Sequence, residues 1–200
     1  MSKHAFLPEL RKELDDAITY GTQRTSLTLA RRGLRLALAA KQPGEIEYFK
    51  AQLQIIKKDF AAAIDHLDRA IELNPCDGAA YNDRALCMIE LGIIDGSMPF
   101  FDRGIAVEPD YATIHHNKGW LLNNTGRHTE AICCFRKALE LEPDRAVTYD
   151  NLADAQLNLG DRKGALVSYR KVLALLKPGE CRSIRKQIRI CIEGLEGGTK

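Results

Sequence analysis

The residues whose types are most typical of metal-binding or catalytic sites are two adjacent pairs, His115-His116 and Cys133-Cys134. Neighbouring residues on a helix point about 100° apart, so the two histidines cannot bind one metal ion as histidines four residues apart would. Zinc-binding cysteines are usually spaced as Cys-x-x-Cys, and none of the six cysteines forms such a pair. We expect the cysteines to be reduced, small hydrophobic residues that bind no metal.

The sequence carries no signature of a catalytic site. It lacks the phosphate loop Gly-x-x-x-x-Gly-Lys-Ser/Thr, and no pattern places a nucleophile beside a base or gathers metal ligands. His115 shares a periodic column with Tyr81 and Tyr149, which indicates a packing role. We therefore predict a protein that is not an enzyme, with no catalytic residue, no cofactor and no metal.

Composition and charge favour a folded protein that neither spans a membrane nor wraps nucleic acid along its length. The 200 residues are 45% hydrophobic and 28% charged, with a formal net charge of +2. Residues 1–58 carry +5 (11 basic, 6 acidic), residues 59–143 carry −7 (7 and 14) and residues 144–200 carry +4 (11 and 7). The acidic centre argues against nucleic-acid binding. No apolar run is long enough to span a bilayer, and Glu9 interrupts any signal-type hydrophobic core, so we expect a cytoplasmic protein.

Several residue types recur at a step of 34 residues. Prolines and glycines keep this step, with the last proline one residue late: Pro75, Pro109, Pro143 and Pro178; Gly92, Gly126 and Gly160. Small and bulky residues form further columns: Ala63, Ser97, Ala131 and Ala165; Ala85, Gly119 and Ala153; Leu67, Phe101, Phe135 and Tyr169. Columns in one register indicate an internal repeat.

Each repeat is predicted to form two helices. In residues 112–143, apolar residues at helical spacing lie on both sides of Thr125-Gly126-Arg127, which predicts a turn between two helices. The proline ends the second helix, and the aspartates that follow can cap the next one: Asp77, Asp110 and Asp144. The small residues let the helices approach closely. One pair buries too little surface to be stable alone, so we expect an all-α solenoid of stacked pairs.

The segments AIDHLDRAIELNP, AICCFRKALELEP and NLADAQLNLGDRKGALVSYRKVLAL resemble the tetratricopeptide repeat family. The resemblance covers residues 44–178 and implies a right-handed superhelical solenoid of helix-turn-helix repeats. The four repeats would be 44–76, 78–110, 112–144 and 146–178. In the first, Lys57-Lys58-Asp59-Phe60 lacks the turn glycine and is interpreted as one residue short, which predicts a shifted first helix.

The two ends of the chain are predicted to be helical additions. Residues 1–43 form a helical hairpin, either a degenerate repeat or an unrelated hairpin that covers the first face of the solenoid. Residues 179–200 form a capping helix and tail, with apolar residues spaced by three and four: Cys181, Ile184, Ile188, Cys191 and Leu195. The basic face of this helix is solvated or, alternatively, binds an acidic partner, RNA or lipid headgroups.

The family resemblance implies a concave peptide-binding groove lined by the first helix of each repeat. The positions that would face it are Ala79, Asn82, Asp83, Leu86, Glu90, Thr113, His116, Asn117, Trp120, Asn124, Val147, Asp150, Asn151, Asp154 and Asn158. Asn117 and Asn151 are one repeat apart and are similar to the asparagine ladder with which some members hold a peptide backbone. The alternative is that these asparagines are only tolerated surface residues.

Trp120 is a candidate binding hot spot, unless its indole packs against a neighbouring helix. Acidic groove residues favour a ligand that carries Lys or Arg. Family members that hold acidic chaperone tails use Lys and Arg on these helices. This sequence has Asp83, Asn117 and Asn151 at the matching positions, so we predict no such carboxylate clamp.

The predicted function is a non-enzymatic scaffold or adaptor that binds a protein or an extended, basic peptide segment in the groove. One alternative is a dedicated chaperone, of the secretion type, that holds a client protein. Another is self-assembly into a homo-oligomer, in which the basic N-terminal hairpin enters the acidic groove of a neighbour or blocks the groove of its own chain. RNA binding is not expected, because helical-repeat RNA readers need a basic surface.

Overall fold

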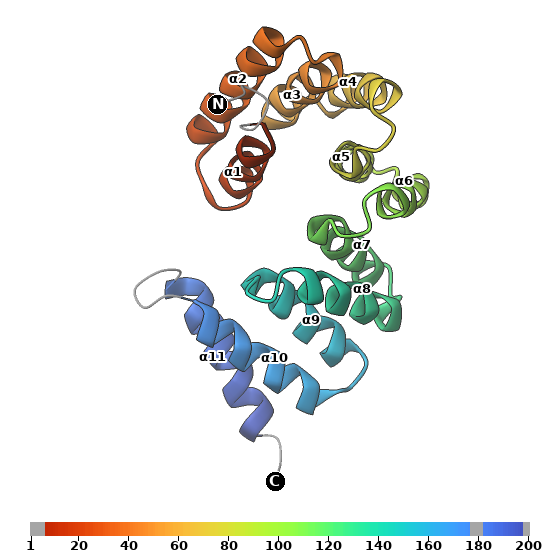
Figure 1. Ribbon diagram of the computed structural model, residues 1–200. Coiled ribbons are helices and arrows are strands. Elements are labelled where there is room, and N and C mark those ends of the chain that lie inside the picture. Colours follow the sequence, from red (N-terminus) through yellow and green to blue (C-terminus); the bar gives the residue numbers. More distant parts are fainter. Residues whose placement is uncertain (1–6, 177–181, 198–200) are drawn as a thin grey trace. The chain divides into compact units, whose positions relative to one another are not determined.

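The structure is a computed structural model that describes residues 7–176 and 182–197, so Pro178 and Cys181 lie outside the described residues. Over these ranges every regular element is an α-helix (Figure 1). The helices are α1 (Leu7–Tyr20), α2 (Gln23–Ala40), α3 (Pro43–Ile56), α4 (Phe60–Leu73), α5 (Gly78–Glu90), α6 (Ile94–Val107), α7 (Ala112–Asn124), α8 (His128–Leu141), α9 (Ala146–Asn158), α10 (Arg162–Leu175) and α11 (Arg182–Gly197). The predicted all-α class is confirmed.

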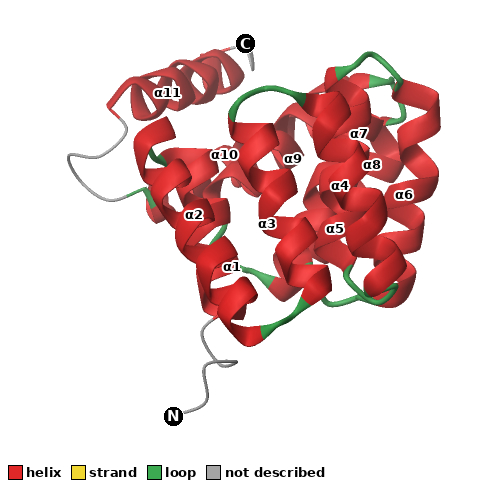
Figure 2. Ribbon diagram, turned by 90° about the horizontal axis from the view of Figure 1, so that it is seen from above, coloured by secondary structure: helices red, strands yellow, loops and turns green. Residues whose placement is uncertain are grey.

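The chain divides into two compact units, called here unit 1 (residues 1–109, with α1 to α6) and unit 2 (residues 110–200, with α7 to α11). In unit 1 the core gathers around Tyr48, Phe49 and Leu67, which are at most 1% exposed. In unit 2 a core cluster around Tyr169 and Val172 joins α10 to α11. Figure 2 shows the same helices from above, without strands in the described part of the chain.

The two helices of a pair approach closely where the repeat has a small residue. Gly119 on α7 illustrates this, because a Cβ added there would lie 2.8 Å from the ring of Phe135 on α8. Phe135 itself is fully buried, as are the other bulky residues of its column within about 2%: Leu67, Phe101 and Tyr169. The periodic columns of the sequence therefore mark the core of each helix pair.

The turn within each of the four helix pairs from α3 to α10 uses a left-handed residue. Gly92, Gly126 and Gly160 have φ angles of 80°, 80° and 79°, and Lys58 has a φ angle of 63° at the same place between α3 and α4. Lys58 lies 34 residues before Gly92, so the first repeat has a turn of ordinary length. The interpretation of this turn as one residue short was wrong, because the lysine adopts the backbone conformation for which the other repeats use glycine.

The predicted helix caps are confirmed in one case of three. The carboxylate of Asp77 accepts a hydrogen bond of 3.1 Å from the amide of Ala80, as an N-cap residue does. The predictions for Asp110 and Asp144 were wrong, because the N-cap residues of α7 and α9 are Tyr111 and Arg145, neither of which makes a side-chain cap bond. Asp77 comes two residues after its proline, whereas Asp110 and Asp144 come one residue after theirs and lie too early.

Candidate functional site

The groove positions predicted in unit 2 differ widely in exposure. On α7, Trp120 is 40% exposed and Asn124 is also exposed, whereas Asn117 is half-buried and His116 is 7% exposed. On α9, Asp154 and Asn158 are exposed, while Asp150 and Asn151 are half-buried. The flanking positions Thr113 and Val147 are half-buried as well. A ligand could therefore reach Trp120, Asn124, Asp154 and Asn158 directly, and His116 hardly at all.

His116 joins two repeats. Its Nδ1 lies 2.9 Å from the hydroxyl of Thr148, and its Nε2 lies 3.4 Å from Nδ2 of Asn151, both on α9. Its ring also packs on Phe135, with the ring centroids 5.8 Å apart. Burial, aided by the charge of Arg145, lowers the pKa of His116 to about 3, so the imidazole is neutral near pH 7. Its role in this structure is to hold α7 and α9 together.

The asparagines of the predicted row also make contacts within the protein. Asn151 contacts His116, and Nδ2 of Asn158 donates a hydrogen bond of 3.3 Å to the side-chain oxygen of Asn123 on α7. Asn124 donates to the backbone oxygen of Trp120 at 3.0 Å. Asn123 was not among the predicted residues, although it adjoins one. The amides of Asn151 and Asn158 therefore link the first helices of neighbouring repeats, and a peptide would have to compete for them.

One column of the repeat explains which predicted positions are buried. Tyr48, Asn82, His116 and Asp150 are spaced by 34 residues, and the first three are 1%, 2% and 7% exposed. At His116 this column points toward the first helix of the following repeat. Asp150 belongs to the last helix pair and is followed by α11 instead. It is consequently only half-buried.

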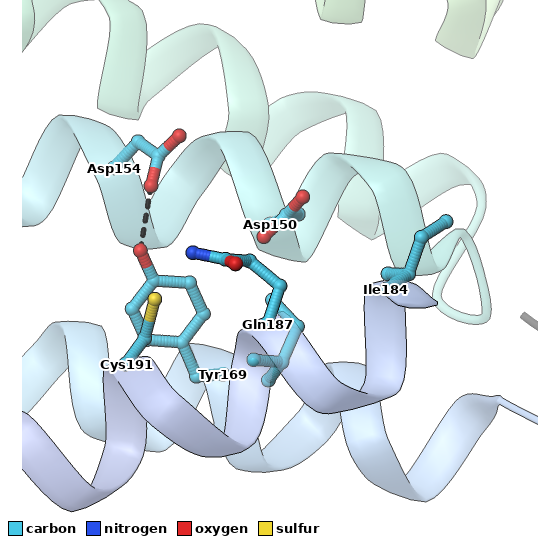
Figure 3. Close-up of a pocket in the computed structure, with 7 residues that line it drawn as sticks. Asp150, Asp154, Tyr169, Ile184, Gln187 and Cys191 are labelled. Carbon is cyan, nitrogen blue, oxygen red and sulfur yellow. Dashed lines mark hydrogen bonds between the residues drawn. The ribbon is translucent and has the colours of Figure 1, made fainter. Parts of the chain in front are cut away.

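A cleft of about 260 Å³ remains between α9, α10 and α11 at this position (Figure 3). Its lining residues are Asp150, Asp154, Tyr169, Ile184, Gln187, Ile188 and Cys191. The hydroxyl of Tyr169 donates a hydrogen bond of 2.6 Å to Asp154. Among the described residues, no hydrogen-bond donor is paired with the carboxylate of Asp150.

The cleft is acidic, and none of the described residues that line it is a Lys or an Arg. Burial and the neighbouring carboxylate of Asp154 raise the pKa of Asp150. Burial and the bond to Asp154 raise the pKa of Tyr169 as well, so this phenol stays protonated and donates. The apolar side of the cleft comes from Ile184 and Ile188 on α11. Sequence reasoning placed these isoleucines in a capping stripe and missed Tyr169 and Gln187 as site residues, because only the fold brings them beside α9.

The groove positions predicted in unit 1 lie on α5 and face a packed helix. Asn82 is buried, Asp83, Leu86 and Ala79 are half-buried, and Glu90 is exposed. The carboxylate of Asp83 accepts hydrogen bonds from Gln52 at 2.5 Å and from Asn82 at 3.0 Å. It also interacts with the carboxylate of Asp15 on α1. Asn82 and Asp83 are thus occupied by contacts within unit 1, whereas Glu90 is open to solvent.

The described residues contain no group of three or more side chains arranged to hold a metal ion. Five cysteines of the described part are free thiols: Cys76, Cys87, Cys133, Cys134 and Cys191. Burial raises the pKa of the Cys87 thiol to about 12, which makes it unreactive near pH 7. None of the helices in the described ranges combines the length and the apolar character needed to cross a bilayer.

Comparison with solved structures shows the same fold in several proteins. TTC0263 from Thermus thermophilus, a thermophilic tetratricopeptide repeat protein, has a TM-score of 0.72 at 19% identity, over 93% of this chain and 98% of that one. YrrB, a tetratricopeptide repeat protein with an unusual peptide-binding site, has a TM-score of 0.61 at 14% identity, over 95% and 98%. The first such domain of Spaghetti (RPAP3), bound to the HSP90 peptide SRMEEVD, has a TM-score of 0.57 at 18% identity, over 60% and 94%.

The sequence comparison agrees with the fold. A family model described as tetratricopeptide repeat matches residues 46–75, 112–145 and 146–175. No match is found among curated protein sequences. The segment 78–110 is not matched, but it forms the helix pair α5 and α6 in the same register. The matched segments and the stacked helix pairs together show that the chain contains tetratricopeptide repeats.

Proposed function

We propose that the protein is a non-enzymatic adaptor that binds an extended segment of another protein on unit 2, with a Lys or Arg of that segment in the cleft beside Asp150. The tetratricopeptide fold supports an interaction scaffold. Two of the similar structures come from proteins described with a peptide site or a bound peptide. The single observation that carries the proposal is the half-buried carboxylate of Asp150, which lines an apolar-sided cleft.

The cleft suits a long basic side chain better than other ligands. The aliphatic stem of Lys or Arg would pack on Ile184 and Ile188, and its charged end would donate hydrogen bonds to Asp150 and Asp154. A charged hydrogen bond to a partly buried carboxylate is stronger than a neutral one, so a single basic residue would set the register of the bound segment. Trp120, exposed on α7, supplies a second anchor of the kind that dominates binding energies.

The proposal also excludes an acidic ligand. The HSP90 peptide SRMEEVD in the Spaghetti complex has two glutamates, an aspartate and a C-terminal carboxylate. At the positions where family members use Lys or Arg to bind such a tail, this chain has Asp83, Asn117 and Asn151, none of which is positively charged. The first is taken up by contacts within unit 1. Like charges across an interface are destabilising, so such a tail should bind poorly.

Fluorescence anisotropy with two labelled peptides tests the proposal. Both peptides have twelve residues, blocked ends and one central Phe, and they differ only in carrying two Lys or two Glu. We expect the Lys peptide to bind at least ten-fold more tightly, and Asp150→Asn with Asp154→Asn to abolish the difference. Asn at position 154 still accepts the Tyr169 hydrogen bond, so the fold should be unchanged.

The matched control is Asp144→Asn, which removes an exposed carboxylate outside the cleft. It should bind the Lys peptide as the unmodified chain does. Equal binding of the two peptides, or equal loss in the control and the cleft variant, would show that the cleft does not select a basic residue.

A further inference from the structure

Helix α1 lies against the same face of unit 1 that the repeats would offer to a ligand. Figure 1 shows α1 on the inner side of the arc formed by α2, α3 and α5. One side of α1 is apolar and buried, with Leu7 and Leu10 at 3% exposure and Leu14 fully buried. These leucines belong to the core cluster that contains Tyr48 on α3 and Ala80 on α5. The opposite side of α1 is exposed and polar.

Arg11 fixes α1 to two first helices at once. Its guanidinium donates to both carboxylate oxygens of Asp77, at 2.9 and 2.7 Å, and to Glu45 at 3.1 Å. It also stacks over the ring of Tyr48, 3.6 Å from the ring centroid. Asp77 begins α5 and Glu45 lies in the first turn of α3, so one basic residue bridges positions 66 and 34 residues away. The combination of leucines and a clamped arginine is the way a groove holds an amphipathic helix.

One contact of α1 brings two carboxylates together. Asp15 brings its carboxylate to Asp83 of α5, which is already held by Gln52 and Asn82. Burial and the charge of Asp15 raise the pKa of Asp83, as expected for two carboxylates that share a site. A helix with a neutral or basic residue in place of Asp15 would fit the same face without this repulsion.

We propose that the face of α3 and α5 is a helix-binding groove that α1 occupies in the free protein. Its external ligand is an amphipathic helix of another protein, with leucines spaced as Leu7, Leu10 and Leu14, a basic residue at the place of Arg11 and no acid at the place of Asp15. This ligand displaces α1. The inference concerns unit 1 and does not rest on the cleft of unit 2.

The test uses the full chain and a labelled peptide of residues 5–21, which contains the α1 sequence. The variant Leu10→Ala with Leu14→Ala weakens α1 in the chain and leaves the groove intact. The matched control, Lys12→Ala with Asp16→Ala, has the same spacing on the exposed side of α1. We expect the peptide to bind the leucine variant at least ten-fold more tightly than it binds the control or the unmodified chain.

Two altered peptides test the chemistry of the groove. A peptide with Asp15→Asn should bind the leucine variant more tightly than the unmodified peptide at pH 8, and one with Arg11→Glu should bind at least ten-fold more weakly. Glu45→Gln in the chain should reduce the preference for Arg11. Asp150→Asn with Asp154→Asn should change none of these affinities, which separates this proposal from the one for unit 2.

Hydrogen exchange of the unmodified chain gives a second readout that does not depend on a variant. The amides of α1 should exchange at least ten-fold faster than those of α3 and α4, because α1 opens by itself. Exchange of α1 only with global unfolding would overturn the proposal, since α1 would then be a permanent part of the core. No peptide binding to a leucine variant with α3 to α6 still protected would also overturn it. A dimer formed by exchange of α1 between copies would make a second copy the occupant and refute an external ligand.

Discussion

Lys58 and Gly126 occupy the same place in two repeats. Introducing a glycine at the first and removing the glycine at the second should change stability in opposite directions. Lys58 has a φ angle of 63° and Gly126 a φ angle of 80°. A side chain in this left-handed region costs about 1–2 kcal/mol, whereas glycine costs about 0.5–1 kcal/mol more than alanine in lost backbone entropy. Lys58→Gly should therefore stabilise unit 1 by about 0.5–1 kcal/mol, and Gly126→Ala should destabilise unit 2 by a similar amount.

The expected change in unfolding free energy comes from the backbone alone, because the space around the turn is open. A Cβ added at Gly126 would meet nothing within 4 Å, so the alanine variant creates no clash. Lys58 is exposed, and its backbone N–H donates a hydrogen bond of 2.9 Å to the carbonyl oxygen of Ile55, which a glycine would also make. Gly92 and Gly160 have the same geometry and should respond like Gly126.

Urea unfolding followed by circular dichroism measures the change, and hydrogen exchange assigns it to unit 1 or unit 2. Stability in repeat proteins adds up from repeats and their interfaces, so the exchange of the altered unit should respond more than that of the other. A lower stability of Lys58→Gly would refute the reasoning, because it would mean that the lysine side chain contributes more than the strain of its backbone costs. A neutral Gly126→Ala would show that this turn does not require glycine.

Three further predictions concern side chains of the core and the site. Phe135→Ala should cost about 3–5 kcal/mol of unfolding free energy in urea titrations, since the ring is fully buried against Gly119. The pKa of Asp83 is raised to about 7, so unit 1 should lose stability as the pH rises from about 4 through 7, and Asp83→Asn should abolish this loss. The pKa of His116 is lowered to about 3, so unit 2 should lose stability as the pH falls below about 6.5, where the unfolded imidazole takes up a proton. Exchange protection of each unit, corrected for the intrinsic rate, should show these opposite trends.

The helix pairs and their core could be predicted from the sequence because the 34-residue step repeats local information. Gly119 and Phe135 meet because the same small and bulky columns pack in every pair. The site was harder to predict, since a groove position and an interface position can be neighbours on one helix. His116 and Asn117 are adjacent, yet the first is buried and the second is half-buried. The periodicity of the sequence alone does not tell which of two neighbouring side chains points into the groove and which points into the interface between repeats.

The position of α1 could not be predicted from the repeat at all. The contact between Arg11 and Asp77 joins residues that are 66 apart in the sequence. Neither residue belongs to a periodic column from which the contact could be predicted. The sequence predicted only a hairpin of residues 1–43 with two alternative roles. Arginine, glutamate and aspartate are common on solvated surfaces, so their types did not indicate that this trio is largely buried.

Both units have a pair of carboxylates beside a tyrosine ring, and only the pair in unit 1 is bound to a basic side chain of the described part of the chain. In unit 1, carboxylates of Glu45 and Asp77 beside the ring of Tyr48 hold an arginine supplied by the chain itself. In unit 2, carboxylates of Asp150 and Asp154 beside Tyr169 line a cleft that receives no basic side chain from the described residues. Asp150 is half-buried, and a partly desolvated carboxylate forms a stronger bond with a cation than a carboxylate on an open surface does. The filled site in unit 1 therefore supports our proposal that the cleft of unit 2 binds a basic residue of a partner and that this residue anchors the complex.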